Sequence, residues 1–329
     1  MEPKEEKLSS TKQTIMLMER PSKFSYYENL DIKLSDQSRI LDNATIEKMV
    51  LLNEVVASDF FILKALAEMS WANVEMLVAA LKAMHKEEPE KAIPDATRDL
   101  VKSRVVRLCK ASLAKGFEYE TASGAPIKVY CATDAGINLI RKKLYYNKSA
   151  EIFNALSPCE EVFRRLACNY VAQRISIAPV VTKYIPGGVD YISGVGKVYM
   201  YSRLYCEAGE SKKVTLFEPI YFRANPLLNS KEEMENFIRS RFLTIKQYSK
   251  KAVTDGFQVS IVFVVEDYDG LKNGMLMIMS EMEDWINKIY FTSENAVYAA
   301  DNVVKSFLKV SKVEDQKPTI MACDKFDFL

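Results

Sequence analysis

The hydrophobic residues of positions 45–144 recur first at the spacing of α-helices, then at that of β-strands, and then at helical spacing again. The pattern predicts three helices, a β-hairpin and a further helix, over residues 45–68, 71–86, 97–116, 117–133 and 134–144. Pro89 and Pro94 separate the second helix from the third, because proline does not continue a helix.

The third predicted helix has a defined beginning, a buried side and an end. Thr97 or Asp99 can cap its first turn with a side-chain oxygen. The residues that we expect on its buried side are Val101, Val105, Leu108 and Leu113. Gly116 is expected to end the helix in the left-handed conformation that glycine adopts easily.

This order of elements is that of a winged helix-turn-helix. In such a domain the third helix is the recognition helix, and the hairpin forms a wing, here with its tip at "ASGAP", residues 122–126. Winged helices also serve as protein-docking modules, so the predicted fold leaves two classes of partner open.

The distribution of charge favours DNA over a protein partner. Residues 97–144 contain ten basic and four acidic residues, whereas the net charge of the whole chain is +1. A local excess of positive charge on a nearly neutral chain indicates contact with a polyanion, which makes double-stranded DNA the expected partner. The candidate DNA contacts are Lys102, Ser103, Arg104, Arg107 and Lys110 on the third helix and Lys128 beside the wing.

The second half of the chain has a different pattern, which predicts a separate domain. Residues 158–312 are expected to form a helix, three strands, a helix, a strand, a helix and a strand, which fits a mixed sheet flanked by helices. The apolar run at residues 257–265 is typical of a buried central strand. The glycine-rich residues 187–196 are expected to form a turn between strands.

The predicted chain is therefore an α+β protein with a winged helix-turn-helix followed by an α/β domain. The winged helix occupies residues 45–148. Residues 1–44 are expected to be a flexible or loosely docked arm, and residues 313–329 a polar tail.

The remaining composition excludes several classes of function. The chain has six cysteines, none in a CxxC motif, and one histidine, His85, so a multi-histidine metal site is excluded. We expect reduced thiols and a cytoplasmic protein. No apolar run reaches the roughly 18 residues that a membrane span requires.

The end of the predicted wing reads "VYCATDAG", residues 129–136, and resembles a motif of the replication-relaxation family. In that family the wing strand closes with Y-x-L-T-x-x-G before a helix. Thr133 and Gly136 match this pattern, and Ala132 stands where leucine is usual. The resemblance covers roughly residues 55–310. It implies a DNA-binding protein of plasmids and conjugative elements, with a second domain similar to restriction-endonuclease-like folds.

The resemblance raises the question of DNA cleavage by the second domain. Nucleases of this fold hold Mg²⁺ with an Asp and a Glu and usually place a Lys two residues after the Glu. The candidates here are Asp190 and Glu218, with Lys246 of the following helix in place of the usual lysine. Ile220 stands at the position of that lysine, and Pro219 adjoins the glutamate. A degenerate, non-catalytic scaffold is therefore favoured, and Mg²⁺ is expected as a cofactor only if the domain is active.

Together these patterns predict a DNA-binding protein of a mobile genetic element that acts in replication initiation or its control. One alternative is a Mg²⁺-dependent endonuclease or nickase that uses the second domain. Another is a transcriptional regulator or protein-docking module. A second copy of the chain and other replication or transfer proteins are further partners consistent with the prediction.

Overall fold

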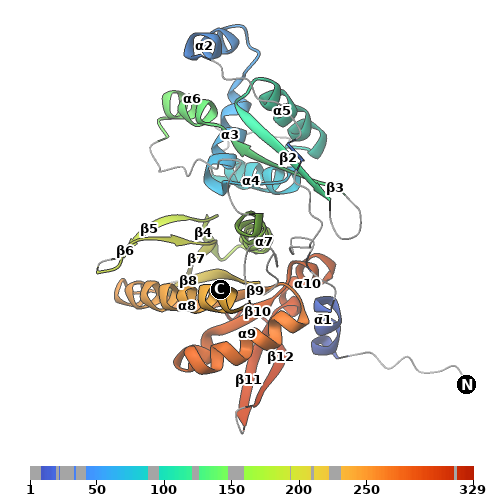
Figure 1. The fold of residues 1–329 in the computed structure, drawn as a ribbon, viewed down its shortest axis with the longest axis vertical. Helices are drawn as coiled ribbons and strands as arrows, with labels where there is room; N and C mark the ends of the chain where they lie inside the picture. Colours follow the sequence, from blue (N-terminus) through green and yellow to red (C-terminus); the bar gives the residue numbers. More distant parts are fainter. Residues whose placement is uncertain are drawn as a thin grey trace, which may run out of the picture. The chain divides into compact units, whose positions relative to one another are not determined.

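The structure of the protein is a computed structural model (Figure 1). It describes residues 9–19, 22, 33–34, 42–87, 96–120, 126–146, 159–192, 194–208, 211–221, 231–314 and 317–329. The chain divides into two compact units. The helical unit comprises Tyr27–Asn169 and Ile185–Val189, and the sheet unit comprises Met1–Tyr26, Tyr170–Tyr184 and Asp190–Leu329.

The helical unit contains the predicted elements in their predicted order, with the first predicted helix divided in two. Its elements are α2 (Asn43–Leu51), α3 (Ala57–Met69), α4 (Val74–Glu87), α5 (Arg98–Lys110) and α6 (Asp134–Leu144), with strands β1 (Lys33–Leu34), β2 (Ala114–Glu120) and β3 (Pro126–Ala132). Residues 122–125 of the predicted wing tip and the domain boundary predicted at residue 148 lie outside the described residues.

The single helix predicted over residues 45–68 is two helices, α2 and α3. The chain leaves α2 through Asn53, whose φ is 56°, and the N–H groups of Asn53 and Glu54 bond the carbonyls of Val50 and Met49 at 3.1 Å and 2.9 Å. This is a Schellman ending, in which asparagine replaces the more usual glycine. Periodicity alone did not show the break because the apolar spacing continues across it.

The core of the helical unit confirms the predicted buried side of the third helix. The side chains that are fully buried there include Val101, Val105, Leu108 and Leu113, together with Leu63 and Leu66 of α3. Strands β2 and β3 pair antiparallel, β1 pairs with the other edge of β2, and a single bridge joins Ala72, between α3 and α4, to Tyr130 of β3.

The sheet unit is built on a mixed seven-stranded sheet, as the pattern of residues 158–312 predicted. Its strands follow the order β12-β11-β10-β9-β8-β7-β4, and β8, β9 and β10 are parallel. The strands are β4 (Val181–Ile185), β7 (Arg203–Ala208), β8 (Ser211–Ile220), β9 (Gln258–Val265), β10 (Ile289–Thr292), β11 (Leu308–Glu314) and β12 (Lys317–Ala322). The predicted central strand, β9, is buried from Ile261 to Val265.

Helices connect and cover the parallel strands. They are α8 (Lys231–Thr254) and α9 (Tyr268–Glu281), which pack against each other and against β9, the short α10 (Glu294–Ala299), and the 3₁₀ turns η2 (Glu283–Lys288) and η3 (Val303–Ser306). Figure 1 shows α8 and α9 along the same face of the sheet, as successive crossovers of one hand require. Helix α7 (Cys159–Ser176) precedes the sheet, and the division between the units falls within it.

The glycine-rich residues 187–196, predicted as a turn, contain a strand and the turn of a second hairpin. Strand β5 (Gly188–Ile192) pairs with β6 (Gly196–Met200) in a two-stranded sheet. Gly194 and Gly196 have φ of 79° and 98°, and these conformations reverse the chain between the strands. The prediction failed here because glycines surround a strand of only five residues.

Both terminal segments contribute to the sheet unit, contrary to the predicted arm and tail. Helix α1 (Ser10–Met18) buries Met18 in the core of this unit, and Thr14 Oγ1 donates a hydrogen bond to the carbonyl of Lys305 at 2.6 Å. The predicted tail holds β12 and the fully buried Phe328. Each segment is too short to show a period, and its partners lie far away in the sequence.

In the part of the chain that the structure describes, no helix is both long enough and apolar enough for a membrane crossing.

Candidate nucleic-acid interface

Helix α5 presents the basic residues that the sequence analysis selected. Thr97 caps it, because Thr97 Oγ1 accepts a hydrogen bond from the backbone N–H of Leu100 at 3.3 Å. The buried stripe fixes which side faces the core. The opposite side leaves Lys102, Ser103, Arg107 and Lys110 exposed. We call these four residues the basic face of α5.

Arg104 belongs to a different side of the helix and to a different kind of contact. Its Nε donates to Asp59 Oδ1 at 2.7 Å, and its Nη2 donates to the other carboxylate oxygen of Asp59. The side chains of Arg104 and Asp59 are 15% and 1% exposed. A carboxylate so deeply buried requires a paired cation, so we assign Arg104 to holding α3 against α5 and no longer include it among the DNA contacts.

Lys128 is also paired, although on the surface. It lies opposite Glu118 in the register of β3 and β2, and its Nζ is 3.0 Å from the Glu118 carboxylate. Arg98, at the start of α5, pairs with Glu75 of α4 at 2.9 Å. Exposed pairs of this kind contribute little to stability and can be exchanged for phosphate contacts. The place of Lys128 among the DNA contacts remains a prediction.

The basic face of α5 differs from all of these residues in lacking acidic partners. Among the described residues, Lys102, Arg107 and Lys110 form no ion pair. The hydroxyl of Ser103 donates to the carbonyl of Leu100 at 2.8 Å, which leaves its oxygen lone pairs directed to solvent. The structure therefore divides the predicted basic residues into paired ones and an unpaired group of three on one helix.

The end of α5 is set by Ser112 instead of the predicted Gly116, which lies within β2. Ser112 has a φ of 54°, and the N–H groups of Ser112 and Leu113 bond the carbonyls of Cys109 and Leu108, both at 2.9 Å. This Schellman ending places its left-handed residue, Ser112, four positions earlier than the predicted glycine. The sequence signal misled because serine rarely adopts that conformation.

The Thr-x-x-Gly pattern of residues 133–136 has a structural explanation in this turn. Thr133 Oγ1 donates to the carbonyl of Ser112 at 2.8 Å and accepts from the N–H of Gly136 at 3.2 Å, which caps α6. A Cβ at Gly136 would lie 2.2 Å from the carbonyl oxygen of Leu113. The two residues therefore fix α6 to the turn that ends the basic helix.

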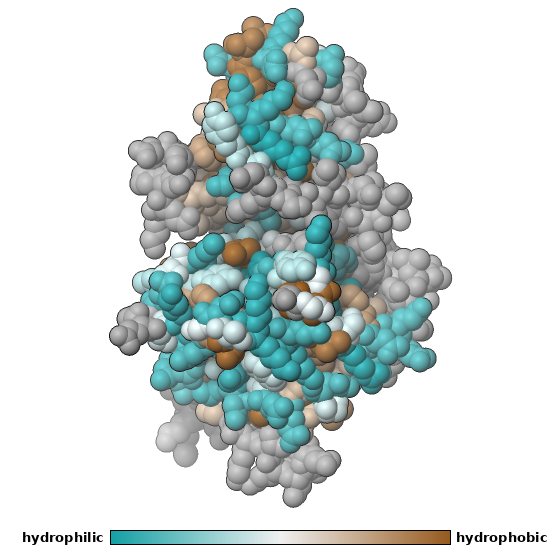
Figure 2. Space-filling model, turned by 90° about the vertical axis from the view of Figure 1, so that its left-hand side faces the viewer, coloured by the Kyte–Doolittle hydropathy of each residue, from teal (hydrophilic) through white to brown (hydrophobic). Residues whose placement is uncertain are grey.

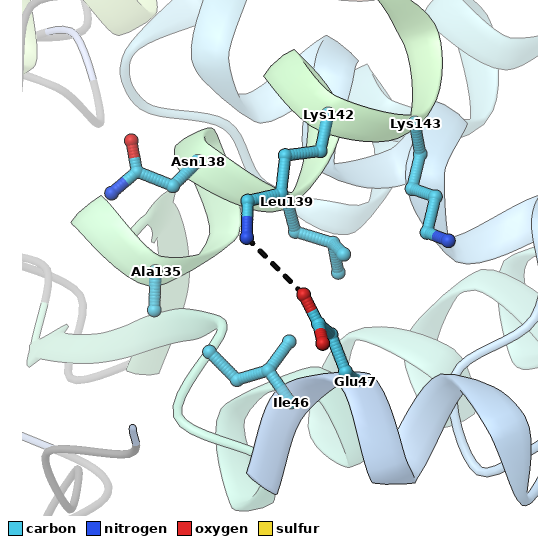
Figure 3. Close-up of a pocket in the computed structure, with 7 residues that line it drawn as sticks. All are labelled: Ile46, Glu47, Ala135, Asn138, Leu139, Lys142 and Lys143. Atoms are coloured by element: carbon cyan, nitrogen blue, oxygen red, sulfur yellow. Dashed lines mark hydrogen bonds and ion pairs between the residues drawn. The ribbon is translucent and has the colours of Figure 1, made fainter. Parts of the chain in front are cut away.

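A shallow pocket of about 110 Å³ lies between α2 and α6 (Figure 3). Lys142 of α6 reaches across it to Glu47 of α2, with Nζ 3.3 Å from Oε1. Figure 3 shows Ile46 and Leu139 contributing its apolar surface. Its small size and mixed lining give it no chemistry of its own.

Glu218, the proposed metal ligand on β8, is bound by arginine. Arg241 of α8 donates from Nε to Oε1 at 2.5 Å and from Nη2 to Oε2 at 3.0 Å, and its Nη1 donates to the carbonyl of Tyr199 at 2.8 Å. The side chain of Glu218 is 2% exposed. Both oxygens that a cation would need are occupied by a bidentate guanidinium.

Asp190, the second proposed ligand, also has cationic partners. Arg203 Nη1 donates to Asp190 Oδ2 at 2.6 Å, and Lys251 Nζ lies 3.7 Å from Oδ1. Burial raises the pKa of Asp190, but the N–H of Tyr191 and the Arg203 guanidinium outweigh it and hold that pKa below its usual value. Lys246 lies half-buried on α8, and no contact joins it to either carboxylate.

The three nuclease candidates therefore do not form a cation site in this structure. Within the described ranges, no cluster of three histidine, cysteine, aspartate or glutamate side chains could hold a metal ion. The roles of Arg203 and Arg241 do not show in the sequence, because each arginine pairs with a carboxylate on another element.

Comparison with known proteins identifies no relative of this chain. No family model, no curated protein and no solved structure matches the chain. The resemblance to the replication-relaxation family therefore remains a prediction from the sequence.

Proposed function

We propose that this chain is a sequence-specific DNA-binding protein and that residues 57–144 form a winged helix-turn-helix. The observation that carries the proposal is the unpaired basic face of α5 on the third helix of that arrangement. Exposed cations that lack acidic partners are available to phosphates without first breaking an ion pair.

Each residue of the basic face has an expected role. Lys102 and Lys110 contact phosphates on either side of the major groove. Ser103 is short enough to donate a hydrogen bond to a third phosphate once its hydroxyl turns away from the Leu100 carbonyl. Arg107 lies between the two lysines in the sequence and can donate two parallel hydrogen bonds to the O6 and N7 of a guanine. The β2–β3 hairpin is the wing, and Lys128 contacts the DNA backbone from it.

The proposed process is replication initiation, or its control, on a plasmid or conjugative element. This part of the proposal rests on the resemblance carried by Thr133 and Gly136. The same interface would serve a transcriptional regulator, and the position of the bound DNA site relative to a replication origin or a promoter distinguishes the two.

The sheet unit in this proposal is a nuclease-like scaffold without cleavage chemistry. Glu218 and Asp190 are held by Arg241 and Arg203, and these ion pairs stabilise the unit instead of binding Mg²⁺. We therefore do not propose a nuclease.

The proposal is tested by selecting fragments of the host element's DNA that the full chain retains, followed by titration of the selected duplex. Arg107→Ala should weaken binding to that duplex by roughly 5- to 150-fold, equal to about 1–3 kcal/mol, and should relax the base preference at one position. Lys82→Ala, which removes an exposed lysine of α4, is the matched control and should bind like the parent. Equal binding by the parent and Arg107→Ala would contradict the assignment of α5 as the recognition helix.

A further inference from the structure

A second group of lysines lies on the sheet unit, at the C-terminal half of α8. Residues 231–242 of this helix contain three acidic and three basic residues, whereas residues 243–254 contain three lysines and no acid. Lysines near a helix C-terminus interact favourably with its dipole, which accounts for their presence in part. Lys250 and Lys251 are exposed, and Lys246 is half-buried.

The β5–β6 hairpin adjoins this half of α8 and carries an exposed aromatic ring. Asp190 and Ile192 point inward, to Arg203 and to the hydrophobic core. Tyr191, between them, points outward with 64% of its surface exposed, and Lys197 of β6 is exposed as well. A tyrosine ring exposed in this way offers a flat aromatic face on which a ligand can stack.

The backbone beneath the tyrosine is held in place. Lys251 Nζ donates to the carbonyl of Tyr191 at 3.2 Å, and the neighbouring Asp190 is anchored by Arg203. The tip of the hairpin is open, because no described atom lies within 4 Å of the position that a Cβ would take at Gly194 or Gly196. The backbone that carries the ring is thus held in place beside an open edge. Little conformational entropy of this backbone is therefore lost when a flat ligand stacks on the ring.

Asp190, the carboxylate adjacent to Tyr191, is bound by Arg203 and Lys251, and four other lysines of the sheet unit are unpaired among the described residues. Lys183 of β4, Lys197, Lys246 and Lys250 form no ion pair with any described residue. Figure 2 views the side from which this hairpin projects in Figure 1 and shows a mainly hydrophilic surface on the sheet unit, with isolated hydrophobic side chains. Among its described residues, this face lacks the broad apolar patch that is typical of a binding site for a protein partner (Figure 2).

We propose that this surface, defined by Tyr191, Lys197, Lys246, Lys250 and Lys251, binds single-stranded DNA. An exposed ring on which a base can stack, bordered by lysines that follow the phosphates, is the combination used for unpaired strands. A duplex keeps its bases stacked inside and has no use for the ring. The inference deepens the proposed function: α5 would hold the duplex site, and the hairpin surface an unpaired strand.

The test is a titration of the full chain with a fluorescent 20-nucleotide dT strand and, separately, with the selected duplex. Tyr191→Ala should weaken binding of the dT strand by about 5- to 100-fold, because stacking of one base on an aromatic ring contributes about that much to affinity. Tyr191→Phe keeps the ring and should bind like the parent. Lys197→Ala should reduce the slope of log affinity against log salt concentration by about 0.7, which is the expected contribution of one phosphate on a single strand.

Two controls separate this inference from the proposed function. Tyr298→Ala removes another exposed tyrosine, 72% exposed on α10, and should leave binding of the dT strand unchanged. Arg107→Ala should reduce duplex binding and leave dT binding intact, and Tyr191→Ala the reverse. Binding of dT that depends on Tyr191, without any duplex binding, would support the hairpin surface and overturn the role of α5. A parent that does not bind dT, or a Tyr191→Ala variant that binds it like the parent, overturns the inference.

Discussion

The basic face of α5 and the region between β8 and the N-terminal half of α8 are both rich in charge, yet they differ in how that charge is balanced. On α5, Lys102, Arg107 and Lys110 are exposed and unpaired among the described residues. Under the β5–β6 hairpin, Arg241 is directed at a buried carboxylate, Glu218. The comparison shows that pairing and burial, and not the number of basic residues, separate a candidate binding surface from an ion pair that holds the fold.

The same contrast occurs within one helix. Arg104 and Arg107 are a single turn apart on α5, but the first is bound to Asp59 inside the unit and the second faces solvent. Removing one partner of a buried pair leaves an uncompensated charge, whereas removing an exposed cation costs almost no stability. Stability and binding measurements should therefore sort these residues into two groups.

Glu218→Ala should have the largest effect on stability. It leaves the Arg241 guanidinium, 12% exposed, without its carboxylate, and breaking such a pair costs about 3–5 kcal/mol. Urea unfolding followed at Trp285, in a Trp71→Phe background, reports on the sheet unit alone, because the chain has two tryptophans, one in each unit.

A double variant tests whether pairing is the cause. Replacing both charges, in Glu218→Leu with Arg241→Met, should recover most of the lost stability, since no unpaired charge remains. If Glu218→Ala unfolds at the same urea concentration as the parent, the pair contributes nothing and the contrast with α5 collapses.

Arg104→Ala should destabilise the helical unit by about 3 kcal/mol, because Asp59 stays buried without a cation. The matched control is Arg98→Ala on the same helix, whose pair with Glu75 is 73% and 51% exposed and should contribute at most about 1 kcal/mol. Unfolding followed at Trp71, with Trp285→Phe, measures both variants. An Arg104→Ala variant as stable as Arg98→Ala would return Arg104 to the candidate DNA contacts.

The sequence predicted most of the helical unit but could not separate its cations. Local sequence signals showed the buried stripe of α5 and placed its cap at Thr97 or Asp99, because both depend on residues close together in the chain. The pairing of Arg104 depends on Asp59, which is 45 residues away on another helix. Charge counting therefore placed Arg104 and Arg107 in one group.

The sheet unit was predicted less completely, for the same physical reason. The long apolar run of β9 and the amphipathic α8 carry their own signals. The α1 helix and β12 do not, because each is short and is held by contacts such as the bond from the N–H of Ala322 to Thr11 Oγ1 at 3.0 Å. The sequence predicted which basic and acidic residues were candidates for the sites. It did not predict that arginines bind the carboxylates of Asp190 and Glu218.

Asp190→Asn should have a smaller, pH-dependent effect. The folded-state pKa of Asp190 lies below its ordinary value, so the carboxylate contributes stability above about pH 4 and loses it as pH falls through the lowered pKa. Near pH 7 we expect the free energy of unfolding of the parent to exceed that of the variant by about 1–2 kcal/mol. This difference should stay constant down to about pH 5 and shrink below about pH 4. Melting curves across this range measure it. A difference that grows in acid would mean that Asp190 is not stabilised by Arg203.

Lys110→Ala should have the smallest effect on the fold and a specific effect on binding. The residue is exposed and unpaired, so the free energy of unfolding should change by less than about 0.5 kcal/mol. A lysine that neutralises one phosphate releases condensed counterions, so its removal should flatten the log–log dependence of affinity on salt by about 0.9. Because a phosphate contact carries no base information, affinity should fall alike on the selected duplex and on a scrambled one. Titrations at several salt concentrations, with Lys82→Ala as the control, measure both effects. A loss confined to the selected duplex would make Lys110 a base reader, and an unchanged slope would show that the end of the basic face lies away from the DNA.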